Sequence, residues 1–226
     1  SRHKTFTAIS LYHLAQCSFL KGDYYKTIDY LNESKGEDIE HPGLGLLRAI
    51  TYRKMNKREK AYKAIENVLS KDPLNFESYI EKWFWLDKSK ESEKRIHQLF
   101  DREDKTFVGS QLYLETAGLY IELNLWADAI SILEMAHGYF SEKNQIYPMI
   151  EYYLGYCYQQ NGDSDKAVTY YKKASKQKDD YVFPYRSLSE KVLKAALDKN
   201  PDDSNAWLYL GNLLYHHRRH IEAVQA

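Results

Sequence analysis

The sequence has few of the residues that interrupt or cross-link a polypeptide. Only 2 of its 226 residues are cysteine, 5 are proline and 10 are glycine. The low proline count favours a packed and nearly all-helical structure, because proline ends helices. Cys17 and Cys157 lie far apart along the chain. We therefore expect two buried free thiols and no disulfide.

The sequence also lacks net charge and long apolar runs. Its 32 lysine and arginine residues balance 32 aspartate and glutamate residues. A nucleic-acid partner would require a basic stripe to neutralise phosphates, so we expect none. No apolar run is long enough to span a membrane. The chain begins without Met and stops inside its last predicted helix, so we expect a fragment of a longer chain. We expect its location to be cytoplasmic.

Residues 151–174 define a helix–turn–helix unit that the rest of the chain repeats. Gly155 lies in the first predicted helix, and Ala167 and Tyr171 lie on one face of the second. Gly162 lies between the two helices, where the backbone needs a positive φ. The small residues at 155 and 167 allow the two helices to approach closely, so this unit predicts a tightly packed helical pair.

The position of Gly155 recurs along the sequence. Three steps of 34 residues connect four earlier positions, and later steps of 38 and 56 residues lead on: Ala15, Ala49, Trp83, Ala117, Gly155 and Gly211. Twelve residues after these positions stand small residues, except that the third repeat has Arg95: Thr27, Ala61, Ala129, Ala167 and Ala223. Seven residues after four of the Gly155-type positions stand residues that tolerate a left-handed backbone: Gly22, Asn56, Asn124 and Gly162.

A helix–turn–helix period of 34 residues with these small and turn residues resembles the tetratricopeptide repeat. The resemblance implies an all-α fold, a right-handed α-solenoid of about six repeats with one extra unpaired helix at 187–199. The repeats are expected at about 8–41, 42–75, 76–109 (degenerate), 110–147, 148–181 and 204–226 (truncated), in one domain over 1–226. The four extra residues of the fourth repeat are expected in a loop at 140–145.

The expected helices follow from the repeat register and the turn residues. They cover 4–20, 24–34, 44–55, 58–71, 76–87, 89–102, 107–123, 126–139, 147–160, 164–176, 187–199, 204–215 and 221–226.

The last third of the chain has a second resemblance. The segment YVFPYR, the AAL helix, the NPDD turn and the LGNLLY helix occur in this order. This order is similar to the repeat region of large bacterial proteins whose N-terminal β-rich domain looks like a sugar-mutarotase sandwich. The resemblance implies a link to carbohydrate metabolism. The departure from the family is SLS at 187–189, where the family tends to be more acidic.

The tetratricopeptide resemblance implies a concave groove lined by the first helices of the repeats. The candidate binding residues at groove-facing positions are Tyr12, Gln16, Arg53, Phe84, Tyr152, Tyr156, Gln159, Asn212 and Tyr215. Such aromatic side chains can anchor an extended peptide or helix, stack on a sugar, or pack only against neighbouring helices. The Lys and Asn pairs of a chaperone-tail clamp are absent from these positions, since only Asn212 fits, so that function is disfavoured.

Two clusters near the C-terminal end have simpler interpretations. His216, His217 and His220 suit a solvated basic turn better than a metal site, because two arginines lie between them and no carboxylate or cysteine completes a ligand set. The aromatic residues around Pro184 are expected to form a plug: Tyr181, Phe183 and Tyr185.

No nucleophile, acid–base pair or phosphate loop has a recognisable motif, so we expect no enzyme activity and no cofactor. The sequence predicts a non-catalytic scaffold that binds a protein, a peptide or an adjoining domain of its parent chain. The alternative is an accessory repeat tail of a bacterial carbohydrate-active protein. The sequence does not define the oligomeric state.

Overall fold

The structure is a computed structural model that describes residues 2–34, 43–86, 88–100, 106–178 and 182–226. In these ranges the secondary structure is helical and contains no strand, so the fold is all-α as predicted. The chain divides into two compact units, Ser1–Phe100 and Asp101–Ala226. The single continuous array over 1–226 stays a prediction.

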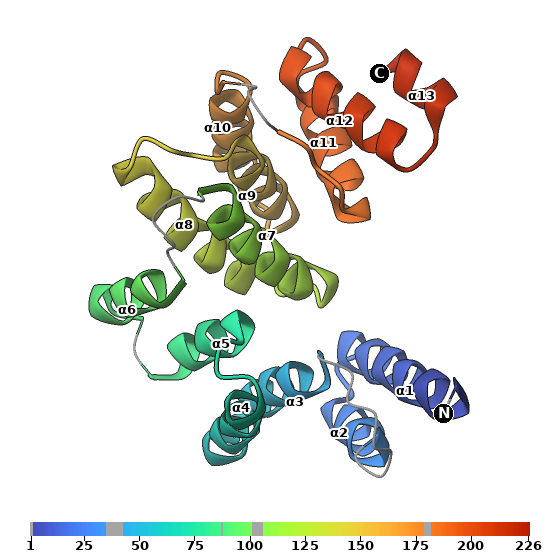
Figure 1. Cartoon of the computed structure of the whole chain (residues 1–226), viewed down its shortest axis with the longest axis vertical. Helices are drawn as coiled ribbons and strands as arrows, with labels where there is room; N and C mark the ends of the chain where they lie inside the picture. Colours follow the sequence, from blue (N-terminus) through green and yellow to red (C-terminus); the bar gives the residue numbers. More distant parts are fainter. Residues whose placement is uncertain (1, 35–42, 87, 101–105, 179–181) are drawn as a thin grey trace. The chain divides into compact units, whose positions relative to one another are not determined.

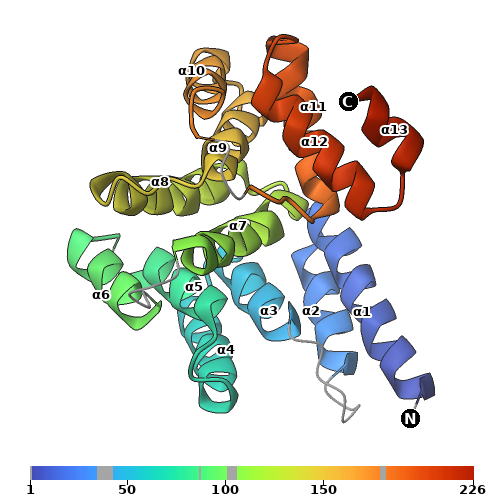
Figure 2. The same cartoon turned by 45° about the horizontal axis from the view of Figure 1, so that its top comes forward.

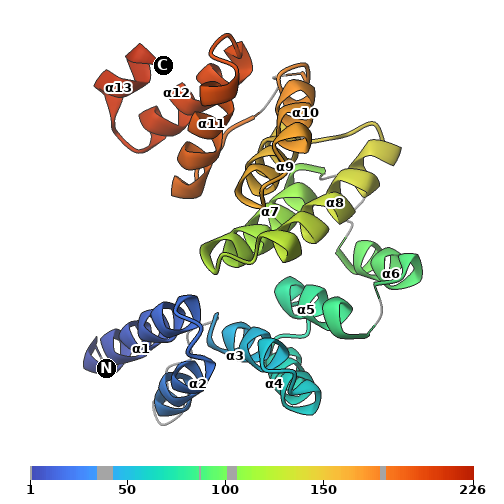
Figure 3. The same ribbon diagram turned by 180° about the vertical axis from the view of Figure 1, so that it is seen from behind.

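Unit 1 consists of helical hairpins that pack in chain order (Figure 1). Its helices are α1 (Arg2–Leu20), α2 (Tyr24–Glu33), α3 (Gly43–Lys54), α4 (Arg58–Lys71), α5 (Phe76–Leu86) and α6 (Lys90–Phe100). Each odd-numbered helix packs against the even-numbered helix that follows, as α3 and α4 do when seen from behind (Figure 3). Helices α2 and α4 also contact the next hairpin, so neighbouring hairpins share a core.

Unit 2 begins with the same arrangement and then adds a helix. It contains α7 (Thr106–Glu122), α8 (Trp126–Glu142), α9 (Pro148–Gln160), α10 (Ser164–Ala174), α11 (Ser187–Lys199), α12 (Ser204–His216) and α13 (His220–Gln225). Helix α11 packs against both α9 and α12, and α12 packs against α13 (Figure 2). The added helix therefore links the α9–α10 hairpin to the last helical pair.

Left-handed turns end the first helix of several hairpins, as the sequence predicts. The φ angles are 78° at Gly22, 57° at Asn56, 56° at Asn124 and 89° at Gly162. The same register position between α12 and α13 is occupied by Arg218, which has a φ of 60°. This arginine is an exception to the glycine and asparagine found at the other left-handed positions of the described chain.

Small residues at the predicted positions bring the paired helices together. The alanines at 15, 49, 61, 117, 129 and 167 are all 0% exposed. A Cβ atom added to Gly155 would lie 2.5 Å from the ring of Tyr171, so only glycine allows this ring to lie against α9. In the degenerate third repeat, Trp83 is 5% exposed and occupies the same register position.

The loop predicted at 140–145 is wrong for its first half. Helix α8 continues to Glu142, and the left-handed residue that follows is Asn144, with a φ of 54°. Phe140 is buried and its ring lies edge-on to Tyr113 at a centroid distance of 6.1 Å. Burial of this ring favours another helical turn over a loop, so most of the inserted residues lengthen the helix.

The two thiols differ in their surroundings. Both cysteines are free, as expected, but Cys157 is buried whereas Cys17 is exposed. The prediction of two buried thiols is therefore wrong for Cys17. The two residues occupy the same register position, but α9 packs against α7 and α8 of the preceding hairpin, whereas α1 is the first helix of unit 1. Burial raises the pKa of the Cys157 thiol, so this sulfur stays protonated.

Candidate functional site

The predicted binding residues of unit 1 make contacts within the unit. Tyr12 is buried, and its hydroxyl accepts a hydrogen bond from Gln16 Nε2 at 3.2 Å. Gln16 Oε1 also lies 2.9 Å from His13 Nδ1. The ring of Tyr12 packs onto Gly43 of α3, where an added Cβ would lie 2.8 Å from the hydroxyl. Tyr12 therefore fixes the approach of α3 to α1.

Arg53 and Phe84 are joined through a buried carboxylate. Arg53 Nε lies 2.6 Å from Glu81 Oε1, and Glu81 is 0% exposed. The Arg53 guanidinium lies over the Phe84 ring at 4.7 Å from its centroid. Trp85 Nε1 donates to the same Glu81 oxygen at 3.2 Å. The Arg53 charge is thus largely compensated inside unit 1, which makes it a poor choice for pairing with a ligand.

Tyr152 does not line an open groove, which corrects its prediction as an anchor. It is 0% exposed, and its hydroxyl donates to both carboxylate oxygens of Asp203 at 3.0 Å. Its ring also lies edge-on to that of Tyr209 at 6.1 Å. The sequence register places Tyr152 on the groove side of α9, but the α11–α12 segment covers that side.

Tyr156 and Gln159 are half-buried and belong to the packing around α9. The ring of Tyr156 lies edge-on to Trp126 of α8 at 6.0 Å. Gln159 Oε1 accepts a hydrogen bond from the Tyr171 hydroxyl of α10 at 3.2 Å. For these residues the structure supports the packing alternative that the sequence left open.

Asn212 and Tyr215 line an open cleft of about 750 Å³ in unit 2. We call this the aromatic cleft. Its lining residues come from the connector before α11 (residues 182–186), from α12, from the α12–α13 turn and from the start of α13. They are Phe183, Pro184, Tyr185, Asn212, Tyr215, His216, Arg218 and His220. Three of its rings are exposed, with exposed fractions of 59% for Phe183, 40% for Tyr185 and 67% for Tyr215. Exposed rings of this kind are available to a ligand.

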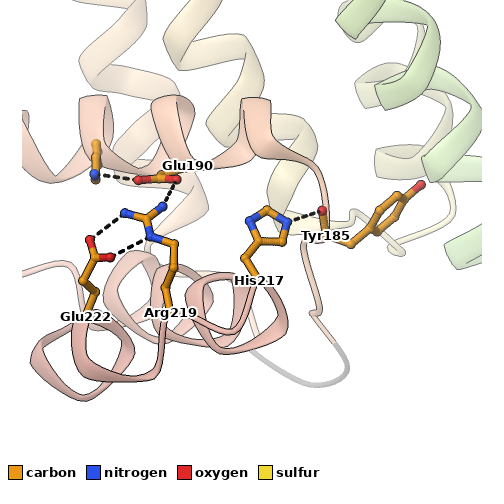
Figure 4. Close-up of polar contacts among 6 residues, drawn as sticks. Tyr185, Glu190, His217, Arg219 and Glu222 are labelled. Carbon is orange, nitrogen blue, oxygen red and sulfur yellow. Dashed lines mark hydrogen bonds and ion pairs between the residues drawn. The ribbon is translucent and has the colours of Figure 1, made fainter.

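The connector wall of the aromatic cleft is held from two sides. His217 Nε2 lies 3.0 Å from the carbonyl oxygen of Tyr185, so this nitrogen is the donor (Figure 4). The Tyr185 hydroxyl donates to Glu115 Oε1 of α7 at 2.5 Å. Arg186 Nη2 forms an ion pair with the same oxygen at 2.7 Å. These contacts fix the position of the Tyr185 ring before any ligand arrives.

The two arginines of the α12–α13 turn have different roles. Arg219 lies between two carboxylates, with Nη1 at 2.6 Å from Glu190 and Nη2 at 2.5 Å from Glu222 (Figure 4). Glu190 is also paired with Lys194 at 2.7 Å. Arg218 is exposed and forms no ion pair with any residue that the structure describes. One arginine therefore ties α13 to α11, whereas the other leaves its charge at the cleft.

The sequence did not identify the aromatic cleft as a site. The sequence predicts that Phe183 and Tyr185 form a plug and that the turn at 216–220 is solvated. Tyr181, the third residue of the predicted plug, lies outside the described residues. Within the described residues no three histidine, cysteine or acidic side chains form a group that could hold a metal ion. The rings of His216 and His217 are 5.5 Å apart, and His220 packs edge-on against Tyr215 at 4.8 Å.

The aromatic cleft can stack against apolar or planar groups, donate hydrogen bonds and attract an anion. No helix in the described part of the chain has both the length and the apolar character needed to cross a bilayer. The aromatic cleft is a candidate binding surface, and its lining comes largely from a connector and a turn.

Comparisons with known proteins agree with the helical-repeat fold. Family models described as tetratricopeptide repeat match residues 150–181 and 192–225. No curated protein matches the chain. Among solved structures, a thermophilic TPR protein from Thermus thermophilus is 16% identical, covers 97% of this chain and 100% of its own, and has a TM-score of 0.40.

Two further solved structures have similar scores. The MamA protein is 20% identical over 74% of this chain and 90% of its own, with a TM-score of 0.37. The TPR domain of P58(IPK) is 16% identical over 96% of this chain and 58% of its own, with a TM-score of 0.35. Nothing about a ligand follows from such distant likenesses. The chain is all-helical in its described residues, and its segments 150–181 and 192–225 are similar to tetratricopeptide repeats.

Proposed function

We propose that this chain is a non-catalytic scaffold that binds a peptide segment of a partner protein, and that the aromatic cleft of unit 2 is the contact site. The observation that supports this proposal is the exposure of Phe183, Tyr185 and Tyr215 around one cleft. Large rings held in place contribute much of the energy of peptide recognition, because little side-chain entropy is lost when they bind.

The other predicted binding residues contribute less to this proposal. Tyr152 is fully buried, and Arg53 already has a carboxylate partner. Asn212 and Tyr215 are the two predicted binding residues that line the cleft. We therefore propose a site at the C-terminal end of unit 2 in place of a groove that runs along every repeat.

The alternative of an accessory repeat tail in a carbohydrate-active protein rests on the same rings. Exposed aromatic side chains stack on sugars as well as on peptide side chains, and the Asn212 amide can bind a hydroxyl group. The cation at Arg218 favours an acidic peptide over a neutral sugar. Binding of a neutral glycan to the cleft would support the alternative instead.

The proposal is tested by selecting peptides from a display library on the whole chain. The affinity of each selected peptide is then measured by calorimetry for wild type, Phe183→Ser and Tyr215→Ser. Both side chains are exposed, so we expect unchanged melting temperatures and at least about tenfold weaker binding. The matched control is Tyr25→Ser, because Tyr25 is 71% exposed on α2 of unit 1. Selected peptides that bind both cleft variants as tightly as wild type would contradict the proposal.

A further inference from the structure

One residue of the α12–α13 turn has a left-handed backbone conformation that its residue type rarely adopts. Four non-glycine residues have a positive φ in the described chain. Three of them are asparagine, which tolerates this conformation, and the fourth is Arg218 with a φ of 60°. A residue held in a sparsely populated conformation points to a function for its side chain when that side chain lies at a binding surface.

The side chain of Arg218 lies at such a surface, and its charge has no ion-pair partner among the described residues. It lines the aromatic cleft, and no residue in the described ranges forms an ion pair with it. The carboxylates that contact the connector or the α12–α13 turn already have partners. Glu115 is bound by Tyr185 and Arg186, and Glu190 is bound by Lys194 and Arg219.

A further acidic side chain that contacts this turn is also occupied. Glu222 receives two hydrogen bonds from Arg219, at 2.7 Å to Oε1 and 2.5 Å to Oε2 (Figure 4). The lining of the cleft itself contains one arginine, two imidazoles and no carboxylate. An anionic group that enters the cleft therefore meets an available cation and no acidic side chain in the lining.

Two of the three exposed rings of the cleft lie outside the segments that match repeat models. The connector residues 182–186 fall between the two segments that match tetratricopeptide models, at 150–181 and 192–225. Phe183 and Tyr185 are exposed there, and Pro184 between them restricts the backbone. The cleft thus joins an added aromatic connector to a cationic turn of the last repeat.

We propose that the aromatic cleft binds an acidic peptide segment of a partner protein. A carboxylate of the segment pairs with Arg218, and its apolar side chains pack against Phe183, Tyr185 and Tyr215. This inference rests on the proposed function and names the chemistry of its ligand. A carboxylate is the protein group best matched to a guanidinium, which offers it two parallel hydrogen bonds.

The test uses two fluorescein-labelled heptapeptides and the whole chain. In the acidic probe glutamate alternates with phenylalanine, and in the neutral probe glutamine replaces each glutamate. Fluorescence anisotropy at low and high salt gives the dissociation constants. We expect the acidic probe to bind wild type about tenfold more tightly at low salt, and we expect this preference to shrink as salt screens the charge.

The decisive variant is Arg218→Asn. Asparagine occupies this register position at Asn56 and Asn124, so the turn should fold at least as well as in wild type. We expect about tenfold weaker binding of the acidic probe and unchanged binding of the neutral probe. Arg218→Lys should retain much of the acidic preference. Arg95→Gln removes one exposed arginine charge from α6 of unit 1 and should change neither affinity.

Two outcomes would overturn the inference. In the first, wild type binds both probes equally, or Arg218→Asn keeps the full acidic preference. If Tyr215→Ser still weakens both probes, the cleft binds peptides without selecting acidic ones, and the proposed function stands. In the second, neither probe binds wild type up to about 1 mM, although displayed peptides do bind in the selection described above. Acidic character is then not what the cleft recognises.

Discussion

The hydroxyl of Tyr152 in α9 donates to both carboxylate oxygens of Asp203, each at 3.0 Å. Asp203 precedes α12 and accepts a hydrogen bond from the backbone N–H of Ala206 at 3.0 Å, so it is the N-cap of that helix. Both side chains are buried, and burial followed by the charge of Asp203 raises the pKa of Tyr152, which keeps its hydroxyl protonated. One carboxylate therefore begins a helix and joins it to α9.

This double role predicts that Asp203→Ala destabilises the chain more than the loss of an ordinary cap. The substitution removes the cap and leaves the buried Tyr152 hydroxyl without its partner, which together cost about 2–4 kcal/mol. The matched control is Asp163→Ala, because Asp163 caps α10 through the N–H of Lys166 at 3.1 Å. That variant should lose about 1 kcal/mol. Urea denaturation measures both, and equal losses would show that the Tyr152 contact adds nothing.

The turn at Arg218 predicts a gain in stability on substitution. Arg218→Gly relieves a left-handed conformation that costs a residue with a side chain about 1 kcal/mol. We expect a higher free energy of unfolding by about that amount, measured by chemical denaturation. Gly162→Ala is the converse control, because φ is 89° there and alanine should cost about 1 kcal/mol. A destabilised Arg218→Gly variant would mean that the arginine side chain supports the turn.

Much of the fold could be predicted from the sequence because each repeat satisfies the same local requirements. Turn residues with a positive φ and buried small residues recur at fixed offsets, which set the helix limits. The predicted limits 58–71 coincide with those of α4. The error at 140–145 arose because turn position was inferred from the period, whereas the burial of Phe140 extends α8 beyond it.

The aromatic cleft could not be predicted in the same way. His217 and Tyr185 are 32 residues apart in sequence, and the connector that contains Tyr185 lies outside the repeat register. A periodic pattern does not predict contacts for residues that interrupt the period. The same limitation explains Tyr152, which the register assigned to a groove although the α11–α12 segment buries it. The inserted helix thus helps to bury one residue that was predicted to bind a ligand, and the connector before this helix contributes other residues to the aromatic cleft.

Close packing at Gly155 predicts opposite effects for two glycine-to-alanine substitutions. Gly155→Ala places a methyl group 2.5 Å from the Tyr171 ring and should destabilise the chain by about 1–3 kcal/mol through overpacking. Gly138 lies inside α8 with no atom within 4 Å of an added Cβ. Gly138→Ala should therefore stabilise the chain by about 1 kcal/mol through helix propensity. Thermal denaturation compares the two, and a shift of the same sign in both would contradict the packing argument.

The ion-pair cluster around Arg219 predicts a specific response to acid. Hydrogen bonds from Lys194 and then Arg219 lower the pKa of Glu190 below its ordinary value of 4.5. The ionised group therefore contributes stability above the unfolded-state pKa, and this contribution is lost as the pH falls through the lower folded-state pKa. Glu190→Gln removes this contribution, so the free energy of unfolding should fall less steeply with acid in the variant than in wild type. The difference at neutral pH should be at most about 1 kcal/mol, because solvent screens partly exposed pairs.

Denaturation curves recorded across the acidic range measure the free energy of unfolding of both proteins as a function of pH. Parallel slopes for the two proteins would show that the cluster does not hold α13 against α11 in solution, since the Arg219–Glu190 ion pair is the contact of this cluster that joins the two helices.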